Sequence, residues 1–369
     1  MAIRVLLLSD ASNPHTMRWA SGLSTKEIEV VIFSLSEPDN VQFWKDLEIK
    51  VFFPKILSNK LSSSSQNLKK FFYPFCILFL LKLVINYRPT VIHAHHASSY
   101  GLLGALVFIH RPYFISVWGS DVFEFPLKSW FHRLILKFNL SRASKIFSTS
   151  QVMKKQALKY TKKEIEVIPF GIDLNLFYRR EKKTSEFFTI GIVKSLEFKY
   201  GIQFLIEAFA IVQKEFSDLS FQLLIVGGGS DELRLRQLVK DLGINQSVTF
   251  VGRVPIKEVP YYQNLLDIAV YPSICEESFG VAVVESCACE VPVIVTRKGG
   301  LVEVVEEDIT GLVVRPNDPH DIAKALSTLI KNPELRSKLG SAGRKRVASL
   351  YNWAENLEAM KLHYFDVNE

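Results

Sequence analysis

Two acidic residues in the segment ICEESFGVAVVES, Ile274 to Ser286, have a type and spacing suited to a ligand that carries several hydroxyl groups. Glu277 falls in the loop after a predicted strand, and Glu285 falls eight residues later, inside a helix predicted over Phe279–Cys289. Backbone N–H groups at the start of a helix are unpaired and favour oxygen ligands. Eight helical residues span about 12 Å with an angular offset of about 80°, so both carboxylates can reach one side. We predict that the two acids bind hydroxyls at two ends of one ligand, because a metal ion would need them closer together.

Two lysines lie just past another predicted strand, in the segment GIVKSLEFKYG. Lys194 and Lys199 follow the strand predicted over Phe188–Val193. Fixed cations in such a place stabilise the charge that develops on a departing diphosphate. Taken by themselves, two solvated surface lysines are the simpler interpretation, so the hypothesis of an anion site depends on the neighbouring residues.

A glycine-rich turn, Ile225 to Ser230, joins a predicted strand to a predicted helix. The dinucleotide-binding pattern Gly-x-Gly-x-x-Gly is not met, because Glu232 stands where the third glycine is required. The turn around Gly228 either brings the backbone close to a nucleotide or is a turn without a ligand.

His93 and His95 share one face of the strand predicted over Val91–His95, because strand side chains alternate. No acidic residue accompanies them in the sequence. We therefore expect a polar strand end here and no metal site.

The composition is that of an ordinary globular protein in a reducing compartment. Of the 369 residues, 48% are apolar and 22% are charged. A chain of this length predicts two domains. Four cysteines are too few for a disulfide framework, so we expect free thiols. The first residues, MAIRVLLLSD, indicate a buried strand and no signal peptide. These features predict a cytoplasmic protein.

The basic charge is concentrated in the first half of the chain. Up to Arg180 the chain contains 24 Lys and Arg against 12 Asp and Glu, whereas the remainder contains 21 against 26. Nucleic acid, an anionic membrane surface or an anionic substrate would each suit such a surface, and so would plain solvation.

Short apolar runs alternate with helical patterns along the whole chain, which predicts parallel, doubly wound α/β sheets. The predicted strands of the first half are Arg4–Ser9, Glu29–Leu35, Lys50–Phe53, Val91–His95, Tyr113–Val117, Lys145–Thr149 and Glu166–Ile168. Those of the second half are Phe188–Val193, Phe221–Val226, Ser247–Val251, Ile268–Tyr271, Val293–Val295 and Gly311–Val314. The helices predicted by the same pattern include Thr16–Leu23, Gly101–Phe108, Ile202–Glu215, Ser230–Leu242, Phe279–Cys289, Pro319–Ile330 and Asn352–Phe365. A polar linker near residue 180 separates an N-terminal domain, 1–175, from a C-terminal domain, 176–348, and the last segment is 349–369.

One apolar segment, Lys69 to Pro89, is too short to span a membrane, because its unbroken apolar run is about half of the roughly 20 residues required. We expect a packed helix, with a position in the lipid interface as the alternative. The Ser62–Ser65 patch predicts an exposed loop.

Taken together, these segments resemble the signature of the family 4 retaining glycosyltransferases of the bacterial and archaeal group 1 type. The pair Glu277 and Glu285 carries the resemblance, and it is joined by four further matches. These are Lys194 and Lys199 with Tyr200-Gly201, Val167–Asp173, Thr249–Val254, and the later segments Gly299–Glu303 and Thr310–Leu312. The resemblance implies a GT-B fold, in which two Rossmann-like domains face a cleft. It also implies that the last helix crosses back to the N-terminal domain.

The resemblance assigns roles to these residues in a C-terminal, donor-binding domain. It implies that Glu285 binds the ribose hydroxyls, that Glu277 with the amides of Phe279 and Gly280 binds the sugar, and that Lys194 and Lys199 neutralise the diphosphate. Glu277, Lys199 and Lys194 are therefore the candidate catalytic residues, and no metal or other cofactor is expected. The further candidates for donor binding are Ser278, Gly171, Gly228, Gly252, Arg253 and Val254.

The chain departs from the family pattern at several positions. The N-terminal glycine loop is replaced by Ser12–Trp19, which makes His15, Arg18 and Trp19 candidates for the acceptor side together with His95. Trp118 stands where a histidine is common; it offers one donor and no acceptor, so Asp121 becomes a further candidate. Lys194 replaces an arginine, which keeps the charge and loses the fork geometry.

The function implied is retaining transfer of a hexose-type sugar from a UDP- or GDP-sugar to a glycan or lipid-linked acceptor. The basic N-terminal half favours cell-surface polysaccharide or glycolipid synthesis at the inner face of the cytoplasmic membrane, with no nucleic acid as partner. Two alternatives remain at this stage: another enzyme of the same fold, such as a sugar phosphorylase or a sugar-nucleotide epimerase, and a non-catalytic nucleotide-sugar binder.

Overall fold

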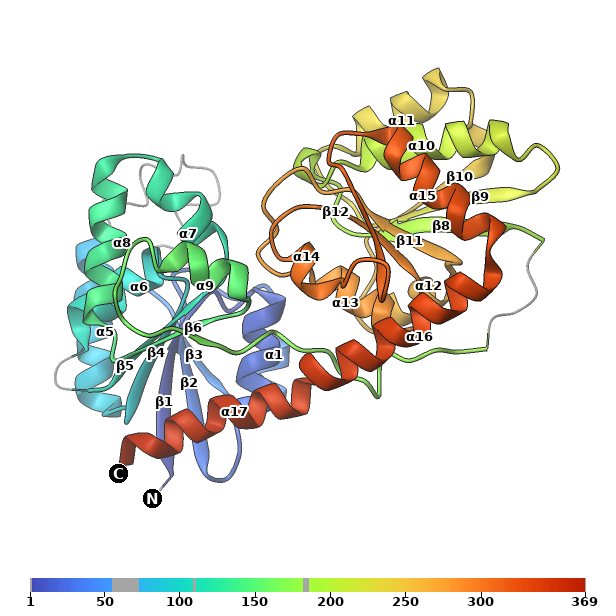
Figure 1. The fold of residues 1–369 in the computed structure, drawn as a ribbon. Helices are drawn as coiled ribbons and strands as arrows, with labels where there is room; N and C mark the ends of the chain where they lie inside the picture. The colour runs from blue at the N-terminus through green and yellow to red at the C-terminus, as the bar shows by residue number, and fades with distance from the viewer. Residues whose placement is uncertain (1, 55–72, 109–110, 182–185, 369) are drawn as a thin grey trace. The chain divides into compact units, whose positions relative to one another are not determined.

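A computed structural model of the chain describes residues 2–54, 73–108, 111–181 and 186–368. The chain forms two compact units, which we call unit 1 (Met1–Pro169 with Glu355–Glu369) and unit 2 (Phe170–Ala354). Each unit contains a parallel sheet flanked by helices (Figure 1). The predicted α/β class with two doubly wound sheets is confirmed.

The sheet of unit 1 has the strand order β3-β2-β1-β4-β5-β6-β7, and its strands pair in parallel. The strands are β1 (Ile3–Leu8), β2 (Ile28–Phe33), β3 (Lys50–Phe52), β4 (Val91–His95), β5 (Tyr113–Val117), β6 (Lys145–Ser148) and β7 (Glu166–Val167). The chain runs from β1 towards one edge and then returns to place β4 beside β1. Open parallel sheets bind ligands beyond the carboxyl ends of their strands at such a reversal.

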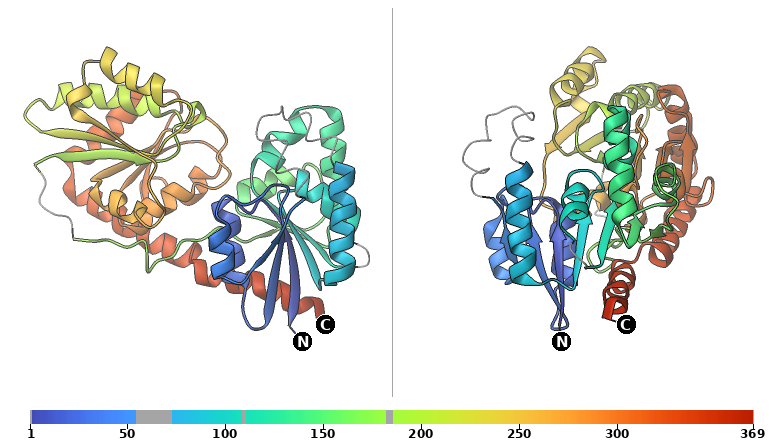
Figure 2. Two further views of the ribbon diagram at one scale, coloured as in Figure 1. Left: turned by 180° about the vertical axis from the view of Figure 1, so that it is seen from behind. Right: turned by 90° about the vertical axis from the view of Figure 1, so that its left-hand side faces the viewer.

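Helices cover both faces of this sheet (Figures 1 and 2). They are α1 (Pro14–Leu23), α2 (Val41–Asp46), α5 (Tyr73–Tyr87), α6 (Ser99–Val107), α7 (Ser120–Phe123), α8 (Trp130–Arg142), α9 (Gln151–Ala157) and α17 (Trp353–Phe365), with 3-10 turns η1 (Phe125–Leu127) and η4 (Asp366–Asn368). Right-handed crossovers towards opposite edges place α1 on one face and α5, α6 and α8 on the other. Leu80, Leu103 and Leu136 of these three helices pack with Ile92 and Ile115 of the strands in one buried cluster.

The sheet of unit 2 has the order β10-β9-β8-β11-β12-β13, again with parallel pairs. Its strands are β8 (Phe188–Val193), β9 (Phe221–Val226), β10 (Val248–Gly252), β11 (Ile268–Tyr271), β12 (Val293–Thr296) and β13 (Gly311–Val314). Its helices are α10 (Ile202–Glu215), α11 (Glu232–Asp241), α12 (Val259–Leu265), α13 (Val281–Ala288), α14 (Leu301–Val304), α15 (Pro319–Lys331) and α16 (Pro333–Leu350), with η2 (Phe198–Tyr200) and η3 (Asn245–Ser247). The strand order reverses between β8 and β11.

The start of the helix predicted over Phe279–Cys289 is wrong. The helix α13 begins at Val281, and its N-cap, Gly280, has a φ of 107°. No helical residue adopts such a φ, and glycine adopts it without a steric penalty. Glu285 is therefore a little more than one turn into the helix, and Phe279 belongs to the preceding loop.

The long helix α16 was not predicted from the sequence. Pro333 stands at its start, and Asn332 caps it by accepting a hydrogen bond from the Leu335 amide at 2.9 Å. Both are residue types that favour a helix start. Gly340 and Gly343 lie inside the helix, and glycine is unfavourable in a helix interior, so the sequence does not show a clear helical pattern here. They permit a close approach: a β-carbon on Gly340 would lie 2.1 Å from the Glu290 carbonyl oxygen, and one on Gly343 would lie 3.3 Å from Cys287 Sγ.

Within the apolar segment Lys69 to Pro89, residues 73–87 form α5. Its Cys76, Leu80 and Val84 are buried, whereas Leu78 and Ile85 are exposed, so the expected helix packs on unit 1 by one face. The Ser62–Ser65 patch lies outside the described residues. Across the described ranges, none of the helices has the length and apolarity to cross a bilayer. The four cysteines are free thiols, and three of them are buried.

Candidate functional site

The reversal of strand order in unit 2 brings a predicted lysine and a predicted glutamate together. Lys194 directly follows β8, and Glu277 lies in the loop after β11, the neighbouring strand. The Lys194 Nζ atom is 2.8 Å from Glu277 Oε1, although the two residues are 83 positions apart in the chain. A cation and an anion are thus fixed at the edge of the sheet where open α/β sheets bind ligands.

Further polar contacts hold the Glu277 carboxylate. Ser273 Oγ donates to Glu277 Oε1 at 2.7 Å, and Thr296 Oγ1 donates to the Ser273 carbonyl at 2.6 Å. Burial acts to raise the pKa of Glu277, but the charge and hydrogen bond of Lys194 outweigh it and hold the pKa below its ordinary value. Burial likewise acts to lower the pKa of Lys194, and the Glu277 charge raises it overall. Both groups are therefore charged at neutral pH.

The Tyr200 ring lies close to the ammonium groups of both lysines of the predicted diphosphate site. Lys194 Nζ lies 4.2 Å from the centre of the Tyr200 ring and Lys199 Nζ lies 5.4 Å from it. Both distances are within cation–π range. The Lys199 side chain is exposed, whereas its carbonyl accepts a hydrogen bond from the Ile274 amide at 3.0 Å. Gly201 follows with a φ of 63°, and a β-carbon there would lie 2.2 Å from the Pro272 carbonyl oxygen. We call Lys194, Lys199, Tyr200, Ser273 and Glu277 the lysine–glutamate cluster.

Two glycines after β12 press against the backbone of this cluster. Gly299 has a φ of 51°, and a β-carbon there would lie 2.3 Å from the Glu277 carbonyl oxygen and 2.5 Å from its amide nitrogen. The Gly300 amide donates to the Glu277 carbonyl at 2.7 Å, and a β-carbon on Gly300 would lie 2.7 Å from Phe279 Cα. The segment Gly299–Gly300 therefore fixes where the backbone of Glu277 lies.

The predicted donor residues after β9 and β10 also meet. The Gly227 amide donates to the Gly252 carbonyl at 2.8 Å, and Gly228 faces Arg253, whose Cγ would lie 3.0 Å from an added β-carbon. Arg253 is exposed, and Val254 beside it is half-buried. A β-carbon on Gly227 would lie 1.9 Å from the Lys194 carbonyl oxygen, so this turn packs directly on the lysine's backbone.

The remaining predicted donor residues surround α13. Glu285 is buried within the helix, and Ser278 is half-buried in the loop before it. The buried Phe279 ring packs edge-on against Tyr351 and Phe170, at centroid distances of 5.1 and 6.4 Å. Gly171, next to Phe170, is buried and has a φ of 66°.

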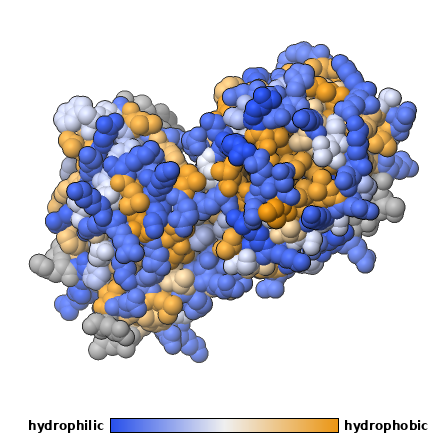
Figure 3. Space-filling model, viewed as in Figure 1, coloured by the Kyte–Doolittle hydropathy of each residue, from blue (hydrophilic) through white to orange (hydrophobic). Residues whose placement is uncertain are grey.

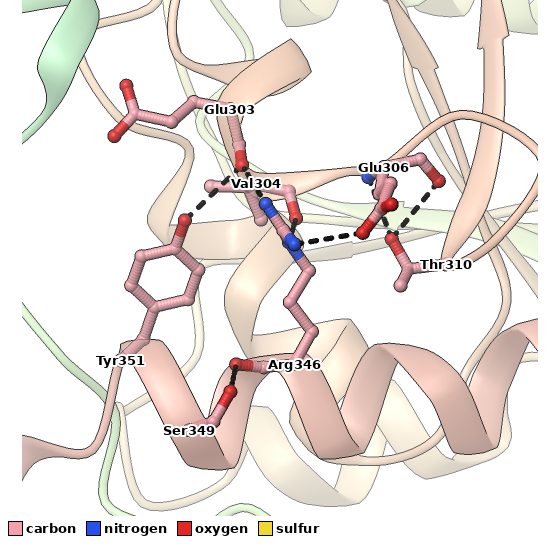
Figure 4. A network of polar contacts seen from close by, with 7 residues as sticks. All are labelled: Glu303, Val304, Glu306, Thr310, Arg346, Ser349 and Tyr351. Carbon is pink, nitrogen blue, oxygen red and sulfur yellow. Dashed lines mark hydrogen bonds and ion pairs between the residues drawn. The ribbon is translucent and has the colours of Figure 1, made fainter.

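A polar network holds the segment from α14 to β13 in place (Figure 4). The Arg346 guanidinium donates to the carbonyls of Val304 and Glu303, each at 3.0 Å, and pairs with the Glu306 carboxylate at 3.0 Å. Tyr351 donates to the same Glu303 carbonyl at 3.3 Å. Figure 4 shows the Glu303 carboxylate pointing away from Arg346. The network therefore fixes the backbone of Glu303, and the Glu303 carboxylate takes no part in it.

In unit 1, the predicted acceptor-side residues converge on the Trp118 ring. His95 lies 4.5 Å from it in a tilted arrangement, His96 lies at 5.1 Å, and His15 of α1 lies at 6.1 Å edge-on, all as centroid distances. Three elements contribute these residues: α1 contains His15, β4 contains His93 and His95, and Trp118 follows β5. They meet where β4 lies beside β1. We call His15, His93, His95, His96 and Trp118 the histidine–tryptophan cluster.

Both ring nitrogens of His93 are used inside unit 1. Nδ1 lies 2.6 Å from the Tyr364 hydroxyl of α17, and Nε2 lies 2.8 Å from Ser116 Oγ. Burial lowers the pKa of His93 to about 3 and lowers the pKa of His95 well below its ordinary value. Burial, with the charges of Arg18 and His96, lowers the pKa of His15 to about 4. These imidazoles are therefore neutral at pH 7.

The Asp121 carboxylate binds backbone amides of the surrounding loops. Its carboxylate accepts hydrogen bonds from the amides of Ala97 at 2.7 Å, Gly119 at 2.8 Å and Trp118 at 3.2 Å, and the side chain is buried. The carboxylate thus ties the loop after β4 to the loop after β5 and positions Trp118. Trp19 is buried beside the same cluster, and Arg18 is half-buried.

The small cavity within the histidine–tryptophan cluster has a volume of about 10 Å³ and is lined by His95, Trp118 and Thr149 among others. This is the size of a single water molecule and too small for a sugar. Within the described part of the chain, no group of three or more His, Cys, Asp or Glu side chains is arranged to hold a metal ion.

The predicted donor-site residues all lie in unit 2 and the predicted acceptor-side residues all lie in unit 1. Sequence reasoning missed the residues that orient them: Ser273, Thr296, Arg346 and Tyr364. Ser273 stands two residues after the end of a predicted strand, and this position could have identified it from the sequence. Thr296, Arg346 and Tyr364 contact residues that are distant in the sequence, so no local sequence pattern identifies them.

Comparison with known proteins identifies the class to which this chain belongs. Residues 176–346 match the family model for group 1 glycosyl transferases, and residues 4–150 match the model for glycosyl transferase 4-like proteins. The two matches together cover most of the chain. The chain therefore belongs to the group 1, family 4-like glycosyltransferases, which are hexosyltransferases.

Three similar proteins illustrate the relationship. An uncharacterized glycosyltransferase of Methanocaldococcus jannaschii is 27% identical over 283 residues, which is 76% of each chain. The D-inositol 3-phosphate glycosyltransferase of Corynebacterium jeikeium is 33% identical over 216 residues, and this match spans 54% of the present chain and about half of the relative, 51%. The structure of Anabaena HepE in complex with UDP superimposes with a TM-score of 0.82 at 17% identity, over 99% of this chain and 100% of HepE. This likeness confirms the predicted GT-B fold class.

Proposed function

We propose that this protein transfers a hexose-type sugar from a UDP- or GDP-sugar to a glycan or lipid-linked acceptor, with retention of the anomeric configuration. The observation that carries the proposal is the ion pair between Lys194 and Glu277 at the strand reversal of unit 2. It places a cation for phosphate and an acceptor for hydroxyls side by side. The solved HepE complex with UDP, in a protein of the same fold, supports a nucleotide-sugar donor.

In this proposal the lysine–glutamate cluster serves the donor. Lys199, which is exposed, and Lys194 bind the diphosphate, and the Tyr200 ring beneath both ammonium groups keeps them together. Glu277 accepts hydrogen bonds from the sugar hydroxyls, and Glu285 accepts those of the ribose. The charge that grows on the departing diphosphate meets two fixed cations, which lowers the barrier without a metal ion. The departing phosphate also takes the acceptor proton on the same face of the sugar.

The histidine–tryptophan cluster of unit 1 is assigned to the acceptor side. Its depressed pKa values keep His15 and His95 neutral, so they act as hydrogen-bond partners without adding charge. We place the protein in the cytoplasm, peripheral at the inner membrane face, in polysaccharide or glycolipid synthesis.

A thermal-shift screen with UDP-, GDP- and ADP-sugars tests the donor site. A donor at 100 times its dissociation constant should stabilise the wild type by about 2.7 kcal/mol. Glu285→Ala should lose this shift, while Glu334→Ala, at an exposed position of the same unit, should keep it. Stabilisation by the same donor in both variants would contradict the role of Glu285. No shift with any donor would favour a protein that must bind its acceptor first or one that is not a transferase.

The stereochemistry and the absence of a metal requirement are tested on the product. Transfer should proceed in the presence of a chelator, and NMR of the product should show the anomeric configuration of the donor. An inverted product would overturn the retaining mechanism. Epimerised nucleotide sugar or free sugar phosphate as the only product would favour another enzyme of the same fold.

A further inference from the structure

Helix α8 of unit 1 presents an apolar stripe to solvent. Trp130, Phe131, Leu134 and Phe138 are 72%, 56%, 51% and 42% exposed. Side chains of this kind are normally buried. Trp130, Leu134 and Phe138 follow one another at four-residue intervals, so they form a single line along the helix. The opposite face of α8 packs into unit 1 through buried residues, which are Leu136, Asn139 and Leu140. The helix is therefore apolar on two sides, and only one side has a partner within unit 1.

The neighbouring helices extend this apolar stripe. Helix α6 contacts α5 on one flank and α8 on the other, and the right-hand view of Figure 2 looks onto this side of unit 1. Leu106 of α6 and Leu78, Phe79 and Ile85 of α5 are exposed as well. Figure 3 shows one face of the molecule, on which apolar residues reach the surface of unit 1 among hydrophilic ones. We call the exposed large apolar residues of α5, α6 and α8 the apolar helix face; it comprises Phe75, Leu78, Phe79, Ile85, Leu106, Trp130, Phe131, Leu134 and Phe138.

The charged side chains on the three helices of this face are all basic. Helices α5, α6 and α8 contain no Asp or Glu, and between Glu48 and Glu164 the chain contains two acidic residues, Asp121 and Glu124. Asp121 is buried against backbone amides, whereas Glu124 is exposed between α7 and η1, ahead of α8. Arg133 and Lys137 are exposed. At about 100° per residue, they lie directly beside the line of Trp130, Leu134 and Phe138. Among the described residues, neither side chain forms an ion pair.

We propose that the apolar helix face docks on an anionic lipid bilayer. Trp and other apolar side chains enter the boundary between headgroups and acyl chains, and basic side chains beside them are attracted to anionic headgroups. The combination of an aromatic stripe with unpaired basic residues and no acid on three adjacent helices matches this surface. A second copy of the chain is a poorer match, because two such faces would bring basic residues against each other.

Docking on α8 has a consequence for the acceptor. The chain passes from Trp118 through α7 and η1 directly into Trp130, so α8 begins at the carboxyl edge of the sheet, where the histidine–tryptophan cluster lies. A bilayer at this end of α8 brings a lipid-linked acceptor next to that cluster. This inference deepens the proposed function and depends on its lipid-linked acceptor.

Sedimentation with vesicles tests the surface on the full chain. The wild type should bind vesicles of phosphatidylcholine with phosphatidylglycerol and bind those of phosphatidylcholine alone weakly. The double variant Trp130→Gln/Phe131→Gln should reduce the affinity by roughly tenfold or more. Arg133→Gln/Lys137→Gln should reduce it by about fivefold for each charge on anionic vesicles. The control Leu233→Gln/Ile256→Gln removes two exposed apolar side chains from unit 2 and should bind as the wild type does.

A second measurement does not depend on substitutions that reduce apolar area. Trp130 is exposed, Trp353 is half-buried, and Trp19, Trp44 and Trp118 are buried, so lipids brominated on their acyl chains should quench fluorescence chiefly from Trp130 upon binding. Trp130→Phe keeps an apolar ring and should bind vesicles while losing that quenching. Wild-type binding by Trp130→Gln/Phe131→Gln would overturn the proposal. So would a concentration-dependent dimer that this variant abolishes, because the face would then cover a second copy.

The donor screen separates this proposal from the proposed function. The α8 variants should keep the thermal shift with the donor, because the lysine–glutamate cluster lies in unit 2. Loss of vesicle binding with an intact donor shift supports the docking surface. A donor shift in a wild type that binds no vesicles overturns the docking surface and leaves glycosyl transfer standing.

Discussion

The chemistry proposed for this glycosyltransferase depends on individual side chains whose charges are set by their neighbours. Glu277 and Lys194 are both largely buried, with 10% and 15% of their side-chain surface exposed, and each lowers the cost of the other's charge. Removal of one partner from a buried ion pair leaves an uncompensated charge in a poor solvent. Lys199 shares the Tyr200 ring with Lys194 but lies in solvent. The two lysines therefore differ in what they contribute to stability, although both are assigned to the same ligand.

This difference predicts distinct outcomes for two matched substitutions. Lys194→Met should reduce the free energy of unfolding by about 3 kcal/mol, because Glu277 loses its buried partner. Lys199→Met should change it by less than about 0.5 kcal/mol. Both variants should lose at least about 100-fold in transferase rate, because each removes a cation from the diphosphate. Urea unfolding and a transfer assay measure the two effects. Equal stability of the two variants would contradict the structural role of the ion pair.

Loops between strands and helices place these side chains, and glycine determines how closely the loops pack. Gly299 and Gly300 lie against the backbone of Glu277 and Phe279 at distances that no β-carbon tolerates. Gly243, in contrast, has a φ of 70° and open space around it. A comparison of Gly299 with Gly243 therefore separates the effect of a positive φ from the effect of a close contact.

Gly299→Ala should displace the Glu277 loop, whereas Gly243→Ala should impose the cost of a left-handed conformation alone. We expect a loss of about 1–2 kcal/mol in unfolding free energy for Gly243→Ala. Gly299→Ala should lose more than this and should also weaken donor binding. Chemical denaturation and the donor thermal shift measure the two quantities. Unchanged donor binding in Gly299→Ala would show that Glu277 does not depend on this contact.

The two units differ in how they should respond to pH. The histidines with lowered pKa, His15, His93 and His95, all lie in unit 1 and are neutral when folded. Unfolding returns each to the ordinary value of about 6.5, so below this pH the unfolded chain binds protons that the folded unit does not. Folding stability is therefore complete above about pH 6.5 and falls as the pH decreases towards about 4. Glu277 of unit 2 follows the same direction, but only below its ordinary pKa near 4.5.

Unit 1 should accordingly lose stability between about pH 6.5 and 5 before unit 2 does. Each buried histidine contributes up to about 1.4 kcal/mol per pH unit in this range. Differential scanning calorimetry from pH 7 to 5 should show a decreasing transition for unit 1. His95→Phe removes one titrating ring and should flatten this dependence, while His320→Gln, at an exposed position of unit 2, should not. A transition for unit 1 that is independent of pH would contradict the buried neutral histidines.

Short-range patterns in the sequence determined the strands of this protein, whereas they did not reveal helix α16. The strands Val91–His95, Phe188–Val193 and Ile268–Tyr271 have the bounds that the apolar runs predicted. The reason is that a buried parallel strand is a continuous apolar segment between polar turns. Lys194, Lys199 and Glu277 were predicted as site residues because each follows the end of a predicted strand. The start of α13 was mispredicted because the conformation of one residue, Gly280, decides it.

The tertiary structure alone decided which of these elements meet. The pairing of Lys194 with Glu277 depends on β8 lying beside β11, and the approach of α16 to α13 depends on Gly343, which lies against Cys287. Tyr364 reaches His93 from 271 residues away. The outward orientation of Trp130 depends likewise on which side of α8 the core of unit 1 covers. Such contacts arise from strand order and helix packing, which local periodicity does not encode, and they position every side chain to which a role is assigned.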